Sequence, residues 1–150
     1  MSRREYPERP IVGVGAVVWR GERLLLIRRG KPPRLGQWSL PGGAQRLGET
    51  LAQAVAREVL EETGLAVGGV ELLTALDLIE RDADDGRVRY HYTLVDFTAE
   101  APPSGEAVAG DDAGEVGWFT PEEAAGLGLW SETDRILAMA VERRRAARAR

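Results

Sequence analysis

The chain contains no cysteine and a single histidine, His91. The first absence excludes disulfides, thiolate metal sites and a cysteine nucleophile, and the second excludes a metal site built from several histidines. Long apolar runs are also missing: none approaches the roughly 18 residues that a membrane-spanning helix needs, and the first ten residues lack the apolar stretch of a signal peptide. We therefore expect a cytoplasmic protein with no membrane partner, in which carboxylates are the available metal ligands.

Charge and composition indicate one globular domain without a general affinity for nucleic acid. The formal net charge of the 150 residues is −4, so any phosphate group has to be bound by a local site. With 43% hydrophobic residues, the chain is able to build its own core. We expect a single domain over residues 1–150, with residues 1–8 and 143–150 as flexible tails.

Apolar and β-branched runs alternate with turn and helix signals. The runs predict two hairpins, each with a turn that contains glycine and charged residues. Their strands cover residues 11–19, 23–28, 70–79 and 88–97. Between the hairpins, residues 50–63 contain neither Gly nor Pro, and Gly64 follows them, which predicts a helix with a left-handed stop. Hairpins interleaved with helices are typical of an α/β or α+β fold with a mixed sheet.

The remaining segments are predicted as two loops, a strand and two helices. Residues 31–48 and 99–114 have the composition of irregular surface loops, and a strand is expected around residues 115–119. Thr120 begins a capping box for a short helix. Ser131 is expected to cap the last helix, whose Arg-rich end we expect to be frayed.

The helix over residues 50–63 has one acidic face and one apolar face. At about 100° per residue, Glu58, Glu61 and Glu62 share one arc, whereas Val55 and Val59 lie on a separate apolar arc. Like charges at these spacings repel each other unless a cation binds between them. Since Mg²⁺ prefers oxygen ligands, this face is a candidate metal site.

The turn Pro41-Gly42-Gly43 precedes this helix, and a backbone carbonyl from the turn is a candidate further ligand. Arg57 lies beside the acidic arc and has two candidate partners, Glu61 four residues later and Glu49 in the preceding loop. Its expected role is to orient the carboxylates.

These residues follow the spacing of the Nudix box. The motif reads Gly43, Glu49, Arg57-Glu58, an apolar Val59, Glu61-Glu62, Gly64 and an apolar Leu65. The preceding residues 37–43 and the later residues 116–119 also resemble the family. The resemblance is strong over residues 37–65 and weaker elsewhere.

Similarity to Nudix enzymes implies an α/β/α sandwich around a central mixed sheet, and a hydrolase that cuts a nucleoside diphosphate linked to another group X. Glu58, Glu61 and Glu62 then correspond to the metal-binding carboxylates, with the Gly43 carbonyl as an extra ligand. Glu49 and Arg57 correspond to their supporting pair. The resemblance implies Mg²⁺ as the ion, with Mn²⁺ as the alternative, and a small nucleotide as the substrate.

The general base stays open between two kinds of residue, because family members place it differently. Glu58 is the first choice. A late-loop acid is the second, with Asp112 ahead of Asp111, Glu106 and Glu115.

Substrate contacts are less specific. Arg28 and Arg29 end a strand that enters the first loop, where either a phosphate contact or a solvated strand end fits them. The aromatic residues of the strand over 88–97 fit core packing or stacking on a base.

The resemblance is greatest to the ADP-ribose pyrophosphatase-like group, which produces AMP and ribose 5-phosphate. One alternative is a sanitising enzyme that hydrolyses oxidised nucleoside triphosphates. The other is a nucleotide-sensing domain without catalysis, against which the complete set of motif residues argues.

A homodimer is expected because many relatives dimerise. Isopentenyl diphosphate isomerisation is disfavoured because the chain has no cysteine.

Overall fold

The computed structural model describes residues 4–31 and 34–149. Within these ranges the chain forms seven strands and three helices. The strands are β1 (Ile11–Arg20), β2 (Arg23–Arg29), β3 (Trp38–Ser39), β4 (Gly42–Ala44), β5 (Gly68–Arg81), β6 (Val88–Glu100) and β7 (Ala113–Phe119). The helices are α1 (Leu51–Thr63), α2 (Pro121–Ala125) and α3 (Ser131–Arg148).

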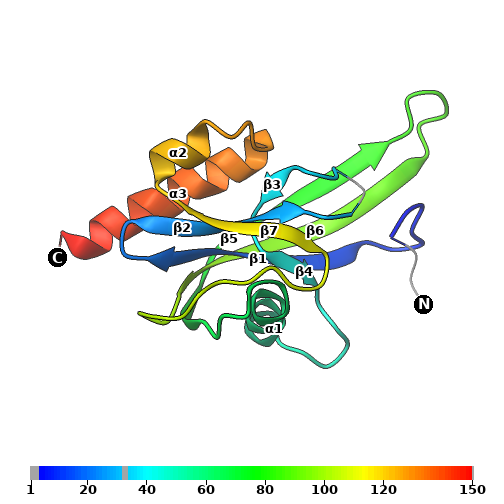
Figure 1. Ribbon diagram of the computed structural model, residues 1–150. Coiled ribbons are helices and arrows are strands. Elements are labelled where there is room, and N and C mark those ends of the chain that lie inside the picture. The colour runs from blue at the N-terminus through cyan, green and yellow to red at the C-terminus, as the bar shows by residue number, and fades with distance from the viewer. Residues whose placement is uncertain (1–3, 32–33, 150) are drawn as a thin grey trace.

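One mixed sheet organises the molecule (Figure 1). Its strands follow the order β3-β2-β1-β6-β5, while β4 pairs with β1 and β7 pairs with β2. β1 and β6 are parallel from the pair Ile11–Tyr92 to the pair Trp19–Glu100. The other pairings are antiparallel. The pairing of β1 with β6 brings residues about 80 positions apart in the chain side by side, and this pairing positions much of the site described below.

The helices cover opposite faces of this sheet, with α1 on one side and α2 and α3 on the other (Figure 1). Alternate residues of β1 serve the two cores, as expected for a strand that is buried on both faces. Val18 packs in the core that contains Val59 of α1. Its neighbour Val17 packs in the core that contains Ile136 of α3. The predicted α/β/α sandwich is confirmed.

The start of α2 agrees with its predicted capping box, and α1 begins one residue after the start of the helix predicted over residues 50–63. Thr50 and Gln53 form a capping box at the start of α1, and Gly64 ends the helix with a φ of 75°. Thr120 caps α2 in the same way with Glu123. The start of α3 differs from the prediction, because its N-cap is Trp130, which makes no side-chain capping bond. None of the three helices is long and apolar enough to cross a membrane.

Two predicted irregular segments contain more structure than composition indicates. The segment over residues 31–48 includes β3 and β4, which are too short to show any hydrophobic periodicity. Residues 143–148, expected as part of a flexible tail, continue α3. Arg144 accounts for this extension, because it donates to Glu100 at 2.7 Å and lies 4.7 Å from the Trp19 ring centroid.

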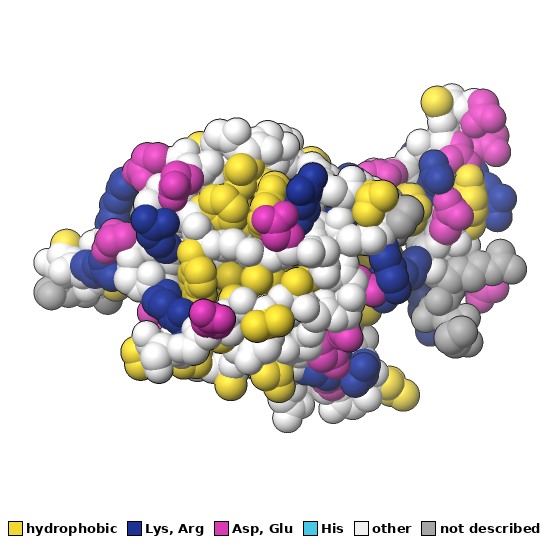
Figure 2. Space-filling model, in the orientation of Figure 1, with side chains coloured by type: hydrophobic (Ala, Val, Ile, Leu, Met, Phe, Trp, Pro, Cys, Tyr) yellow, Lys and Arg dark blue, Asp and Glu magenta, His cyan; other side chains and the backbone are white. Residues whose placement is uncertain are grey.

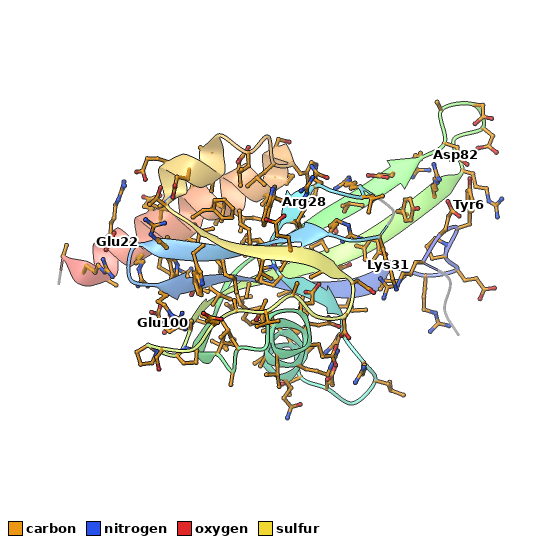
Figure 3. All side chains as sticks on the ribbon, in the orientation of Figure 1. Tyr6, Glu22, Arg28, Lys31, Asp82 and Glu100 are labelled. Carbon is orange, nitrogen blue, oxygen red and sulfur yellow. The ribbon has the colours of Figure 1, made fainter. Side chains whose placement is uncertain are left out.

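The β5–β6 hairpin projects beyond the body of the fold, and the N-terminal segment lies against it (Figure 1). The Tyr6 hydroxyl donates to Asp82 at 2.7 Å (Figure 3). Residues 4–8 of the expected N-terminal tail are therefore attached to this hairpin, and residues 1–3 lie outside the described part of the chain.

Candidate active site

The packing of α1 aims its acidic face at β4. Ala54, Val55 and Val59 are buried against the sheet, which determines how the helix is rotated about its axis. Thr63 is also buried, and its hydroxyl donates to the Val59 carbonyl at 2.7 Å. With this side fixed on the core, the glutamates of the same helix face the glycine strand. Figure 2 shows acidic and basic side chains gathered beside α1, below the sheet.

The glycines of β4 make room for these glutamates. A Cβ on Gly42 would overlap the Val14 carbonyl of β1, and a Cβ on Gly43 would overlap the Glu58 carboxyl group. The Gly42 amide donates to Glu62 Oε1 at 2.6 Å. A side chain at residue 42 would therefore push β4 away from β1, and one at residue 43 would push it away from α1.

Arg57 connects the loop before α1 to the acidic face. Its Nε donates to Glu49 Oε2 at 2.6 Å and its Nη2 donates to Glu49 Oε1 at 2.9 Å, a two-pronged ion pair. Nη2 also donates to the Ala44 carbonyl at 2.9 Å. Nη1 donates to Glu58 at 2.9 Å and to Glu61 Oε2 at 3.2 Å. Both candidate partners of Arg57 are thus contacted, and the arginine is held between them.

These contacts perturb the pKa values of two carboxyl groups in opposite directions. The hydrogen bonds from Arg57, followed by the Arg46 amide, lower the pKa of Glu49 to about 2. Burial raises the pKa of Glu62 to about 8, and the Gly42 amide opposes that rise. Glu49 is therefore a permanent anion that holds Arg57, whereas Glu62 is a covered carboxyl group for which a cation would compensate.

The three glutamates and the Gly43 carbonyl form a donor set that suits a hard divalent cation. Glu58, Glu61, Glu62 and Gly43 line the same cleft. The feature that fits an ion is the close approach of the Glu58 carboxyl group to the Gly43 backbone, which any Cβ at residue 43 would prevent. One oxygen from each of the three glutamates cannot be chosen so that all three lie within 4.8 Å of one another. The predicted convergence of these carboxylates on one ion is therefore partial.

The loop before β7 brings two of the four candidate loop acids into this cleft. Asp111 and Asp112 both line it, and Asp112 is near enough to raise the pKa of Glu62. Asp112 also forms an ion pair with Lys31 at 2.6 Å, and Figure 3 shows Lys31 beyond the end of β2. Glu115 instead lies 3.5 Å from Arg28. The structure thus places Asp112 beside the glutamates, and its role as a base stays a prediction.

Arg28 and Arg29, for which a phosphate contact and a solvated strand end were both left open, have different positions. Arg29 lines the cleft, and its charge lowers the pKa of Glu62. Arg28 donates to the Gly36 carbonyl at 3.0 Å and faces Glu115, outside the residues that line the cleft. Of the two, only Arg29 has a position from which it can meet a phosphate.

The cleft encloses about 890 Å³ and extends well beyond the acidic helix. It reaches residues that motif reading missed, namely Lys31, Arg46, Asp96, Trp130 and Thr133. Asp96 had a signal in the sequence, because it interrupts the apolar run Leu94-Val95-Asp96-Phe97. Trp38 lines the cleft too and also packs edge-on against Phe119 at 5.1 Å, so it combines a packing role with a place in the wall.

Comparison with known proteins agrees with this arrangement. The family model for the NUDIX domain matches residues 9–139. A Methanocaldococcus jannaschii protein named ADP-ribose pyrophosphatase is 37% identical over 110 residues, which are 73% of this chain and 62% of that protein. A Mycobacterium tuberculosis protein whose name proposes an 8-oxo-dGTP diphosphatase is 52% identical over 58 residues, which are 38% of this chain and 40% of that protein.

The crystal structure of a MutT NUDIX hydrolase from Burkholderia pseudomallei superposes with a TM-score of 0.73 at 34% identity. The match covers 88% of this chain and 98% of that chain. By contrast, the chain matches less than two thirds of the length of both curated relatives.

Proposed function

Because the chain belongs to the NUDIX domain family, we propose that it hydrolyses the diphosphate bond of a nucleoside diphosphate linked to another group, with ADP-ribose as the substrate. The observation that carries the proposal is the complete set around Arg57. Glu49 holds the Arg57 guanidinium, which also contacts Glu58 and Glu61. Glu62 accepts a hydrogen bond from the Gly42 amide. A domain that only bound nucleotides would have no need for all of these groups.

Nudix hydrolases use divalent metal ions, and Glu58, Glu61, Glu62 and the Gly43 carbonyl are the groups that would hold them here. When bound, Mg²⁺ or Mn²⁺ would neutralise the diphosphate and lower the pKa of the attacking water. Arg57 keeps Glu58 and Glu61 oriented. Arg29 at the cleft wall is placed to contact a phosphate oxygen.

Hydrolysis requires one proton acceptor and no covalent intermediate. The water oxygen bonds to one phosphorus, the bridging P–O bond breaks, and its electron pair stays on the departing phosphate. Glu58 Oε1 accepts from Arg57, so we assign Oε2 as the atom that takes the proton of the water. Asp112 is the second candidate, because it lies in the same cleft beside Glu62.

The choice of ADP-ribose is supported by the 37% identity to the archaeal relative of that name. The cleft also has room for a dinucleotide-sized molecule, since it falls within the several-hundred-Å³ range of ligand sites. The expected products are AMP and ribose 5-phosphate. The cytoplasmic location and the homodimer stay predictions.

A substrate panel tests this proposal. ADP-ribose, diadenosine polyphosphates, nucleotide sugars, NADH and 8-oxo-dGTP are incubated with Mg²⁺ or Mn²⁺, and the products are separated. We expect AMP and ribose 5-phosphate from ADP-ribose, at the highest kcat/KM of the panel. The absence of turnover on every member of the panel would instead favour the nucleotide-sensing alternative.

One observation favours a second candidate, a hydrolase of oxidised nucleoside triphosphates: the 52% identity to the mycobacterial relative over 58 residues. The products distinguish the two. A nucleoside triphosphate yields a monophosphate and inorganic diphosphate, whereas ADP-ribose yields two monophosphates and no diphosphate. A higher kcat/KM for 8-oxo-dGTP, with diphosphate released, would replace the first assignment with the second.

A further inference from the structure

Asp96 is a buried acid for which the hydrolytic site has no use. It lies in the middle of β6 between Val95 and Phe97, which face the core under α1. Because side chains alternate along a strand, Asp96 points to the opposite face, the one covered by α3. Only 5% of the residue is exposed, and its Oδ2 atom is buried without a hydrogen-bond partner. Leaving such an oxygen unpaired is unfavourable, so it marks a place where a donor is missing.

A glycine makes the space for this carboxyl group. Gly15 of β1 pairs with Asp96 in the parallel ladder. A Cβ on Gly15 would lie 2.8 Å from Asp96 Oδ1 and 3.9 Å from the Leu40 side chain. The carboxyl group therefore occupies a hollow that any residue other than glycine would fill. Asp96, Gly15 and Leu40 all line the same cleft as the α1 glutamates.

The chemistry of this end of the cleft differs from that at α1. Trp130 and Thr133 from the start of α3 line it together with Ile136 and Leu40. The Arg34 guanidinium lies 5.3 Å from the Trp130 ring centroid, so aromatic and apolar side chains and one cation form these walls. Away from the groups that would hold a metal ion, a diphosphate is unfavourable beside an acidic side chain, whereas a flat heterocycle with an N–H edge satisfies both the apolar walls and the unpaired oxygen. A sugar hydroxyl would satisfy the oxygen alone.

We propose that Asp96 accepts a hydrogen bond from the exocyclic amino group of the adenine of the substrate and thereby determines which base the cleft accepts. This proposal rests on the proposed function, because it assigns one end of the cleft to the adenosine half of ADP-ribose. Asp96 acts here in binding and specificity, and the reacting phosphates lie at the α1 end. A carbonyl oxygen in place of the amino group would meet another acceptor and be rejected.

The test compares adenine with hypoxanthine, in which a carbonyl replaces the amino group. We measure kcat/KM for ADP-ribose and for inosine diphosphate ribose in the wild type and in Asp96→Asn. The wild type should prefer adenine by roughly tenfold or more, mainly through KM. Asn keeps the shape of the side chain but offers an N–H₂ group that can pair with the carbonyl. We therefore expect the preference to fall to within about threefold.

Asp77→Asn is the matched control, because Asp77 is an exposed acid on β5 that does not line the cleft. It should keep the wild-type preference. An unchanged preference in Asp96→Asn would overturn the proposal, as would a wild type that favours hypoxanthine or guanine. If Asp96→Asn alters only the discrimination between ADP-ribose and ADP-glucose, Asp96 faces the second sugar and the proposal is also wrong.

A binding measurement separates this proposal from the proposed function. AMP and IMP are titrated calorimetrically into the wild type and Asp96→Asn, which needs no turnover. A wild type that binds AMP more tightly than IMP, with the difference lost in the variant, supports the role of Asp96 even if ADP-ribose is not hydrolysed. Equal affinities for AMP and IMP in the wild type overturn it even if ADP-ribose is hydrolysed.

Discussion

Two groups of carboxylates lie far apart in this fold, one on α1 and one at the tip of the β5–β6 hairpin (Figure 1). At the hairpin, Asp82, Asp84 and Asp85 have ligand atoms that all lie within 4.8 Å of one another. The glutamates of α1 do not reach that spacing. Distance alone would therefore select the hairpin as the metal site.

The surroundings of the two groups reverse that choice. Asp84 and Asp85 are exposed, and Asp85 Oδ1 accepts the Arg87 amide at 2.9 Å, an arrangement typical of a turn. The α1 glutamates are instead partly covered, held by an arginine and pressed against a glycine strand within a cleft. The difference teaches that the partners of an acidic group identify a site better than the separation of its oxygens.

The largest expected effect comes from Glu62→Gln. Gln keeps the shape of the side chain, and its amide oxygen can still accept the Gly42 amide, so the fold should be retained. The variant removes a carboxylate ligand, and we expect kcat on the best substrate to fall at least about 100-fold. Steady-state kinetics with Mg²⁺, together with a thermal melt, measure both quantities.

The hairpin supplies the matched control for that variant. Asp84→Asn also replaces one carboxylate with an amide within an acidic group, and it should leave kcat within about twofold because surface changes away from a site have small effects. Nearly full activity in Glu62→Gln would contradict the assignment of the metal site to α1. Loss of activity in Asp84→Asn would favour the hairpin as the metal site instead.

A smaller effect is expected from Arg57→Lys, which keeps the charge but loses the planar fork that contacts Glu49, Ala44 and Glu58. We expect kcat to fall about 10- to 100-fold, as for other groups that orient metal ligands. Tyr6→Phe removes the corresponding support of Asp82 at the hairpin and should leave kcat unchanged. Equal rates in Arg57→Lys and the wild type would show that the arginine does not position the glutamates.

The sequence predicts contacts between residues that are close together in the chain, and it misses contacts between distant segments. The box residues from Gly43 to Gly64 lie on one helix and the turn before it, so their spacing predicts both α1 and the relation of Arg57 to Glu49. Asp96 and Trp130 enter the cleft through sheet pairing and helix docking between distant segments. Periodicity does not encode those contacts.

The same reasoning explains the misjudged C-terminal segment. Its Arg-rich composition resembles a frayed helix end, but Arg144 donates to Glu100 and to the Gly21 carbonyl, which lie more than 40 and 120 residues earlier. These contacts stabilise the last turns of α3. They form only when the sheet brings these distant residues beside α3, so the local sequence does not predict them.

The last expected effect concerns the stability of the fold and leaves the α1 site unchanged. Burial raises the pKa of Asp96 from 3.8 to about 6, so the folded state binds a proton that the unfolded state has already lost between these pH values. Asp96 is therefore neutral and harmless below about pH 4, and its ionised form destabilises the fold above about pH 6, by about 3 kcal/mol at most.

Asp96→Asn removes this ionisation. The free energy of unfolding should exceed that of the wild type by up to about 3 kcal/mol at pH 8, and the gain should disappear toward pH 4. Urea denaturation at several pH values measures the difference. A gain of equal size at pH 4 and pH 8 would mean that packing, not the buried charge, is responsible.

The most direct test of the account is a titration with Mn²⁺, followed by electron paramagnetic resonance, of the wild type, Glu62→Gln and Asp84→Asn. If α1 holds the ion, Asp84→Asn binds Mn²⁺ like the wild type, and Glu62→Gln binds it at least about tenfold more weakly. Loss of binding in Asp84→Asn, with binding retained in Glu62→Gln, would place the ion on the hairpin and contradict the account.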